Sequence, residues 1–315
     1  MSLSLAPLAG FALLHAGAPV AWTSFTIHPS TVLGIAGLVA LYEESARRRT
    51  RFRESGMEGA DAPAGSPLPV PRLPSAAQRF CFYTALGVLF LSLNGWLHDL
   101  SDYYLFSAHM VQHLLLALVV APLLIMGTPG WMLRPALSWP GVRPAARWLT
   151  RPMRSFAIFN VVVAAWHLPV LYNTAMAHHP VHIAQHLMFL TASVIMWWPI
   201  LSPLPELPRL AYPLQMLYLF LMSIPMSIVA VYIALAGSVL YPAYESAPRI
   251  WAISPLQDQM VGGLIMWIPG GLYFFAVISV IFFRWQQRDG VESSAGAQVD
   301  WTGARDPLFG AGRAP

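Results

Sequence analysis

Seven long apolar stretches dominate this chain of 315 residues, and they restrict it to folds that cross a lipid bilayer. A helix needs about 20 mainly apolar residues to cross about 30 Å of hydrocarbon. No alternating apolar and polar pattern accompanies the stretches, so we expect helices to span the membrane. The sequence therefore predicts an all-α, polytopic transmembrane helical bundle. Its seven predicted spans are Trp22–Tyr42, Phe80–Leu97, Leu105–Met126, Phe156–Met176, His182–Ile200, Tyr212–Ala236 and Gln259–Phe283.

Charged residues are scarce, and the basic ones lie on one side of the predicted spans. Only 10% of the residues are charged, whereas soluble domains carry about 25%. All 18 basic residues are arginine, and 17 of them fall on one side of the seven-span topology, with Arg249 on the other. Because arginine marks the cytoplasmic side, this topology has its N-terminus outside and its C-terminus in the cytoplasm. The net positive charge is therefore explained by the orientation in the membrane, and no nucleic-acid partner is expected.

The spans divide the chain into three parts. Residues 1–21 are the expected outer N-terminal segment, residues 22–285 the seven-helix membrane domain, and residues 286–315 a cytoplasmic tail. The stretch Met1–His15 lacks the positive charges that open a signal peptide, so we expect it to be retained. The tail contains Gly, Ala and Ser without periodicity and is predicted to be disordered.

Histidine placement is the feature that points to chemistry. The single cysteine, Cys81, excludes a disulfide framework and any CxxC metal or redox pair. None of the ten histidines falls in a predicted cytoplasmic loop, and most lie at the outer ends of spans. This one-sided distribution predicts a metal site near the outer face of the bundle.

Spacing identifies the strongest candidate ligands. His109 and His113 are four residues apart, as are His182 and His186, so each pair lies on one face of a helix. These four histidines are the primary predicted metal ligands. His98 and His167 are further candidates, although a single intramembrane histidine more often forms a hydrogen bond between helices. The remaining outer histidines that read most simply as surface residues are His15, His28 and His178.

Other side chains at the same level extend this hypothesis. Asp258 begins span seven, where it is predicted either to orient a ligating histidine or to pair with Arg249. Methionines are usually packing residues in an apolar span. A mixture of imidazole and thioether groups would nevertheless suit copper better than magnesium or calcium. The methionines at comparable predicted depth are Met110, Met176, Met188 and Met260.

Proline interrupts several spans. Pro169 follows His167 by two residues, and Pro122 lies in span three. Proline removes a backbone hydrogen bond and bends a helix, which a membrane bundle tolerates where neighbours satisfy the freed carbonyl. Ordinary kinking is the favoured interpretation, and shaping of the histidine site is the alternative.

Several sequence blocks follow one another in order along the chain over roughly residues 80–285. The blocks are His109–His113, Trp166–Pro169, Leu171–Asn173, His182, Gln185, His186, Trp197–Pro199, Ser254–Leu256, Asp258, Gln259, Gly262, Gly263 and Trp267. Together they resemble the CtaG-type cytochrome c oxidase assembly family of bacterial membrane proteins. An unrelated single-span copper protein with a cupredoxin-like domain shares the family's name, and this sequence does not resemble it.

The resemblance implies a role in the maturation of a haem-copper oxidase, with copper supply or insertion as the leading idea. It implies a multi-pass protein of the bacterial inner (cytoplasmic) membrane, with a copper ion near the periplasmic face. The expected partners are oxidase subunits or other copper chaperones, besides the lipid bilayer, and a homodimer is also compatible. On this interpretation the protein is a chaperone and not an enzyme.

Three alternatives stay open. A membrane-embedded zinc hydrolase would hold zinc with histidines and an aspartate, beside a lipid-accessible cleft. A single-haem electron-transfer protein would ligate haem b with a histidine pair. A purely structural assembly scaffold would tolerate mutation of His109 or His186.

Overall fold

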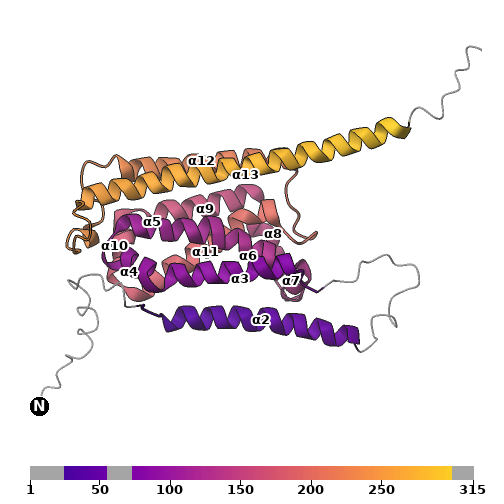
Figure 1. Ribbon diagram of the computed structural model, residues 1–315, viewed down its shortest axis with the longest axis horizontal. Coiled ribbons are helices and arrows are strands. Elements are labelled where there is room, and N and C mark those ends of the chain that lie inside the picture. The colour runs from indigo at the N-terminus through magenta and orange to yellow at the C-terminus, as the bar shows by residue number, and fades with distance from the viewer. Residues whose placement is uncertain (1–24, 55–72, 300–315) are drawn as a thin grey trace, which may run out of the picture.

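The computed structural model describes residues 25–54 and 73–299, and its regular structure over these ranges is helical, without a β-strand (Figure 1). The predicted all-α class is therefore confirmed. The elements are α2 (Pro29–Glu54), α3 (Ala76–Leu93), α4 (Gly95–Tyr103), α5 (Phe106–Leu114), the π-helix η1 (Leu115–Val120), α6 (Ala121–Gly127), α7 (Gly130–Leu137), α8 (Val142–Leu149), α9 (Pro152–Trp166), α10 (Pro169–Ala177), α11 (His179–Leu201), α12 (Tyr212–Ala234), the 3-10 helix η2 (Pro242–Tyr244) and α13 (Pro255–Val299).

Five helices in the described ranges are long and apolar enough to cross a membrane. A sixth crossing is formed if α9 and α10, which are bent by 69° relative to each other, count as one span. The first predicted span overlaps α2, whose apolar part ends at Glu43 and Glu44, and α2 does not meet the same criterion. The crossings that do are α3, the continuous helix Phe106–Gly127, α11, α12 and the Pro255–Arg288 part of α13.

The helices are arranged in layers (Figure 1). α12 and α13 lie side by side on one face, α2 lies on the opposite face, and α5, α9 and α11 lie between them. Two adjacent glycines allow the close approach of α13. A Cβ at Gly263 would lie 2.6 Å from the backbone nitrogen of Ala234 in α12, and one at Gly262 would lie 2.4 Å from the Phe106 ring of α5. Side chains at these positions would push α13 off the bundle.

The π-helix in the third predicted span has a local cause and a specific partner. In a π-helix the carbonyl of residue i accepts from the N–H of residue i+5. The residue five after Ala117 is Pro122, which has no N–H to donate. The indole Nε1 of Trp197 in α11 donates to this carbonyl instead, at 2.8 Å. The segment directly after His113 is therefore held by a side chain from another helix.

Pro169 breaks the fourth predicted span. α9 ends at Trp166, His167 is its C-terminal cap, and Pro169 is at the N-terminus of α10. A proline at the start of a helix loses no hydrogen bond, because the first N–H groups of a helix have no partner within it. The 69° bend leaves His167 at the corner between the two helices.

The C-terminal helix is longer than the membrane domain predicted from the sequence. α13 continues as helix to Val299, beyond the predicted boundary at residue 285. Gln286, Gln287 and Arg288 are good helix formers and extend the span without interruption. The described helix thus includes residues 286–299 of the predicted tail. The rest of the predicted tail, and the predicted outer segment 1–21, lie outside the described residues.

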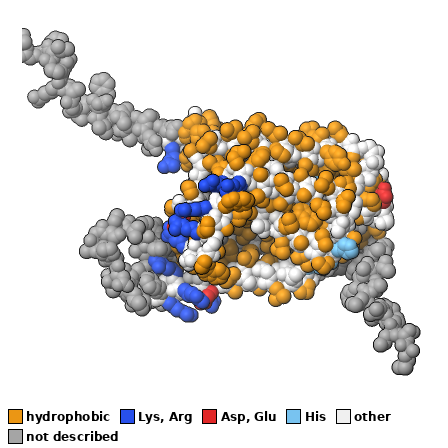
Figure 2. Space-filling model, turned by 180° about the vertical axis from the view of Figure 1, so that it is seen from behind, with side chains coloured by type: hydrophobic (Ala, Val, Ile, Leu, Met, Phe, Trp, Pro, Cys, Tyr) orange, Lys and Arg blue, Asp and Glu red, His pale blue; other side chains and the backbone are white. Residues whose placement is uncertain are grey.

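The two ends of the bundle differ in charge. Figure 2 shows arginine side chains at one end, and histidine and acidic side chains at the other. Most described arginines belong to the C-terminal part of α2, to α7, α8 and their connections, or to the C-terminal part of α13. The end that carries histidine is called the histidine end below, and the opposite end the arginine end. The arginine end is the one that the sequence predicts to be cytoplasmic, and the orientation stays a prediction.

Candidate metal centre

All six histidines predicted as ligands meet in one cluster at the histidine end. The ring of His109 is central, with its centroid 4.2 Å from that of His113 and 5.8 Å from that of His182. His186 lies 6.0 Å from His109 and 4.4 Å from His182 by the same measure. The central rings therefore come from two neighbouring helices, α5 and α11. The cluster also includes His98 of α4 and His167 at the end of α9.

The outer layer of the cluster consists of His98, Asp102, His182 and His186, and its side chains partner one another. One carboxylate oxygen of Asp102 lies 3.4 Å from Nε2 of His98 and 3.4 Å from Nδ1 of His182. The Nε2 atoms of His182 and His186 are 2.8 Å apart. His98 is also fixed from the other side, because the amide nitrogen of Gln112 lies 3.2 Å from its Nδ1.

The inner layer consists of His109, His113 and His167, and its ring nitrogens are mostly without partners. Both ring nitrogens of His109 and both of His113 are buried and make no hydrogen bond. Nδ1 of His167 lies 2.7 Å from the carbonyl oxygen of Val163, to which it donates, and its Nε2 is buried without a partner. These rings present lone pairs to the interior of the protein and not to water.

Asp102 joins this cluster although the sequence did not single it out as a ligand. One possible ligand atom each from Asp102, His109 and His182 lie within 4.8 Å of one another, which is the spacing of a metal site. Asp102 lies four residues after His98, on the same face of α4. The HxxxD spacing was therefore the signal that could have identified it.

Asp258 does not have the predicted role. Its carboxylate accepts hydrogen bonds from the backbone N–H groups of Phe106, at 2.7 Å, and Ser107, at 3.2 Å. It therefore caps the N-terminus of α5 and orients no histidine directly. Arg249, the alternative partner, donates to the backbone carbonyls of Tyr244 and Ala247. Asp258 supports the centre only by fixing the helix that carries His109 and His113.

Two further histidines approach the outer layer. His28, predicted to be a surface residue, packs its ring against His98 with 4.3 Å between centroids, and His179 lies 6.3 Å from His28. Burial lowers the pKa of His98, while the Asp102 carboxylate opposes this shift. The imidazole of His98 therefore favours the neutral form, which is the form that binds a metal.

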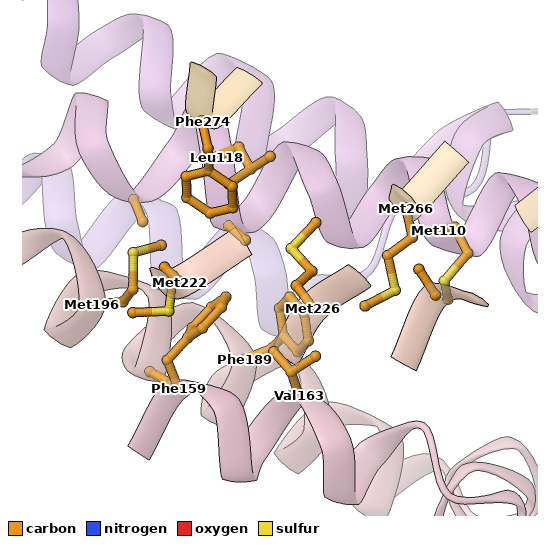
Figure 3. Packing of buried hydrophobic residues seen from close by; sticks show 14 of the residues in the cluster. Met110, Leu118, Phe159, Val163, Phe189, Met196, Met222, Met226, Met266 and Phe274 are labelled. Carbon is orange, nitrogen blue, oxygen red and sulfur yellow. The ribbon is translucent and has the colours of Figure 1, made fainter. Parts of the chain in front are cut away.

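Of the four methionines at the predicted depth, Met110 lies beside the cluster, while two others lie away from it. Met188 and Met260 are 47% and 43% exposed and lie on the outside of the bundle. Met110 is buried, and Figure 3 shows Met266 and Met226 close to it in the core. Sequence depth could not identify these two, because they lie in α13 and α12 and reach the centre only through helix packing.

Three tyrosines pack beside the cluster and form hydrogen bonds with the backbone around it and with one another. The hydroxyl of Tyr241 donates to the carbonyl of His167 at 2.9 Å, and that of Tyr244 donates to the carbonyl of Ser101 at 2.6 Å. The hydroxyl of Tyr172 therefore donates to that of Tyr244, at 2.8 Å. These contacts fix the α12–α13 connection over the site.

On its other side the cluster opens onto a groove of about 480 Å³ between α2, α3 and α11. His28, His98, His179, His182 and His186 line the groove at the outer ends of these helices. Its remaining lining is mainly aliphatic, including Leu38, Leu89 and Leu190. The outer layer thus borders an apolar space, while the inner layer is enclosed by protein.

The chain is similar to known proteins over most of this region. It matches the model of the cytochrome c oxidase caa3 assembly factor family over residues 67–288. Its curated relatives include uncharacterized proteins of Mycobacterium leprae (strain TN) and Mycobacterium tuberculosis (strain CDC 1551 / Oshkosh), each 26% identical over 201 residues. The match covers 59% of this chain and 30% of each relative, so the chain spans less than a third of their length. No solved structure matches the chain.

Proposed function

The chain belongs to the cytochrome c oxidase caa3 assembly factor family, and from that premise we propose that it is a membrane copper-binding assembly factor. On this proposal it supplies or inserts copper during maturation of a haem-copper cytochrome c oxidase. Its site lies in a multi-pass protein of the inner membrane, with the histidine end toward the periplasm. The proposed partners are oxidase subunits or other copper chaperones.

The unpartnered imidazole nitrogens of the inner layer carry the proposal. Buried polar atoms in proteins nearly always have a hydrogen-bond partner, and each one without a partner costs about 1–3 kcal/mol. His109 and His113 together present four such nitrogens. A bound metal ion would satisfy at least one nitrogen of each ring, so the donor set fits a metal that prefers nitrogen ligands.

Neighbouring groups hold several of these rings in the tautomer that ligation requires. A ligating histidine usually donates its second ring N–H to a carboxylate or a backbone carbonyl. The Asp102 carboxylate lies 3.4 Å from Nδ1 of His182, while Nε2 of that ring faces Nε2 of His186 at 2.8 Å, so a metal ion bound by His182 through Nε2 would replace the contact between the two rings. The Val163 carbonyl accepts from Nδ1 of His167, which leaves Nε2 of that ring to bind metal. His98, which contacts both Gln112 and Asp102, is a positioning residue for the carboxylate.

Copper is favoured by the combination of donors. Imidazole suits several transition metals, but thioether groups select monovalent copper. The cluster places buried imidazoles beside the buried thioether of Met110. When bound, copper would be cargo for the oxidase, and the chain's own residues would bind it, orient the ligands and exclude water.

Elemental analysis of detergent-purified, monodisperse protein tests this proposal. Wild type is expected to hold copper, and His109→Ala and His186→Ala are expected to hold less copper per chain. His98→Ala is expected to retain binding at an affinity lowered by about 10- to 100-fold, as for other residues that orient ligands. His178→Ala is the matched control, because this exposed histidine lies at the same end outside the cluster. An absorption spectrum of the same samples tests for haem b.

The same variants are then tested for oxidase maturation in the host membrane. Loss of copper together with loss of mature oxidase supports the proposal. A wild type without copper, with normal oxidase maturation in His109→Ala and His186→Ala, would instead identify a structural scaffold.

One observation supports a second candidate function. A membrane-embedded zinc hydrolase needs an Asp and His metal set beside a space that admits a lipid substrate. Asp102, His109 and His182 provide the former, and the groove of about 480 Å³ beside the outer layer provides the latter. Zinc in place of copper in the purified protein, together with release of fatty acid or another hydrolysis product from added lipid, would favour this function.

A further inference from the structure

We propose that the centre contains a second, deeper site for monovalent copper, held by His113, His167 and the thioethers of Met110, Met226 and Met266. This site is distinct from the set of Asp102, His109 and His182, which combines two residues of the outer layer with His109 of the inner layer and is called the outer set below. The inference rests on the proposed copper function and deepens it, because it assigns different donors, and therefore different copper chemistry, to two levels of the same centre.

A small internal cavity defines the deeper site. It has a volume of about 20 Å³ and lies between α5, α9, α11, α12 and α13. A space of about 10–15 Å³ admits one water-sized species, so the cavity has room for a single ion and for little else. His113, His167, Met110, Met226 and Met266 all line it.

The histidines of the cavity have nitrogens available for an ion. Both ring nitrogens of His113 and Nε2 of His167 are buried without a hydrogen-bond partner. Nδ1 of His167 is committed to the Val163 carbonyl, so its Nε2 carries the lone pair. The ring centroids of His113 and His167 are 5.9 Å apart, and the rings are nearly perpendicular. Two neutral nitrogen donors from different helices therefore border one small space.

The remaining donors of the cavity are soft. Three thioethers accompany the two histidines in the lining, and Figure 3 shows Met226 beside Phe189 and Val163, with Met266 and Met110 next to each other further along the core. The lining contains no carboxylate, and its other members are apolar. Thioether and imidazole without negative charge select monovalent copper over zinc or divalent copper. The single positive charge also costs less to bury than a double charge.

The outer set has harder donors than the cavity does. It includes the carboxylate of Asp102 and no thioether, a combination that divalent copper or zinc also accepts. His109 belongs to the outer set, and its ring centroid is only 4.2 Å from that of His113 in the cavity. The two sites are therefore adjacent levels of one centre, and monovalent copper is expected to prefer the deeper one.

The test separates the two sites by their donors. Anaerobic titration of the purified full chain with Cu(I), in competition with a chromogenic Cu(I) chelator, gives the number and affinity of sites. X-ray absorption at the copper edge then reports whether sulfur is bound. The variant Met110→Leu/Met226→Leu/Met266→Leu removes the thioethers with little change in volume, and such swaps cost less than about 1.5 kcal/mol each. Met196→Leu is the matched control, because Met196 is fully buried outside the cavity.

Wild type and Met196→Leu are expected to show sulfur bound to copper. The triple variant is expected to lose this sulfur signal and to bind its tightest Cu(I) about 10- to 100-fold more weakly. Zn(II) binding at the outer set is expected to stay unchanged in the triple variant and to be lost in His182→Ala. His167→Ala keeps the outer set and is expected to lose the deep Cu(I) equivalent.

Either of two results would overturn the deeper site. One is a wild-type copper centre without sulfur ligands, and the other is a triple variant that binds Cu(I) as tightly as wild type. Both results leave the proposed copper function in place if His109→Ala still holds less copper per chain. A protein that binds no copper in any oxidation state fails the proposed function itself, and with it the deeper site.

Discussion

The two ends of the bundle differ in where their histidines, acids and arginines lie. At the histidine end His109, His113 and Asp258 are buried, and these side chains contact groups inside the protein or, as His109 and His113 do, make no hydrogen bond among the described residues. At the arginine end the described arginines are exposed or half-buried. The ion pair of Arg134 with Glu206, 2.9 Å between nitrogen and oxygen, leaves the two side chains 50% and 29% exposed.

The two kinds of polar side chain differ in what they cost the folded protein. A buried polar group without a partner costs free energy, so a bundle that keeps several of them at one end needs a ligand or a structural role for each. Exposed arginines cost little and are sufficient to set the side of the membrane on which a loop stays. The proposed metal chemistry is therefore assigned to the histidine end, and the predicted orientation rests on the arginine end.

The largest expected effect is a difference in labelling between the two ends, because we expect them to be accessible from opposite sides of the membrane. In a Cys81→Ser background, single cysteines replace two exposed residues, His178 at the histidine end and Arg143 at the arginine end. A membrane-impermeant thiol reagent added to intact spheroplasts is expected to label His178→Cys almost completely. It is expected to label Arg143→Cys only after the membrane is permeabilised.

The Cys81→Ser protein alone controls for background labelling. Equal labelling of both positions from one side would contradict the predicted orientation. In that case the two ends would not lie on opposite sides of the membrane.

The cap at Asp258 gives the next largest effect. Asp258→Ala leaves the buried N–H groups of Phe106 and Ser107 without an acceptor and removes the cap of α5. We expect a loss of about 2–4 kcal/mol in the free energy of unfolding, from the lost cap and the unsatisfied donors. Thermal unfolding in detergent, followed by circular dichroism, measures the change.

Asp258→Asn is the matched variant, because its amide oxygen can still accept one of the two bonds. It is expected to retain more of the wild-type stability than Asp258→Ala does. If the two variants unfold alike at the wild-type temperature, the buried contact contributes nothing, and burial at the histidine end is not costly.

The sequence was sufficient to predict features that depend only on the position of residues along one helix. Apolar length located the five helices that are long and apolar enough to cross a membrane, and the spacing of four residues placed each histidine pair on one face. Helical spacing cannot show which faces of different helices meet. The contact of Asp258 with Phe106 joins residues 152 positions apart, and Met226 and Met266 reach the centre from α12 and α13.

Two errors had local causes that the sequence did contain. Asp102 follows His98 by four residues, so the spacing that identified the histidine pairs also applied to it. The residues after Phe283 include strong helix formers, so the end of the apolar stretch did not mark the end of α13. Both cases show that hydrophobicity locates the membrane but not the limits of a helix or of a site.

The exposed ion pair at the arginine end provides the smallest expected effect and the sharpest contrast with Asp258. Arg134→Gln breaks the hydrogen bond from Nε of Arg134 to Glu206 but leaves both groups in contact with water, which replaces the lost partner. We expect no measurable shift in the temperature of thermal unfolding and no change in copper content. A shift as large as that of Asp258→Ala would mean that stability depends on charge at both ends. In that case the division between a buried chemical end and a solvated orienting end would not hold.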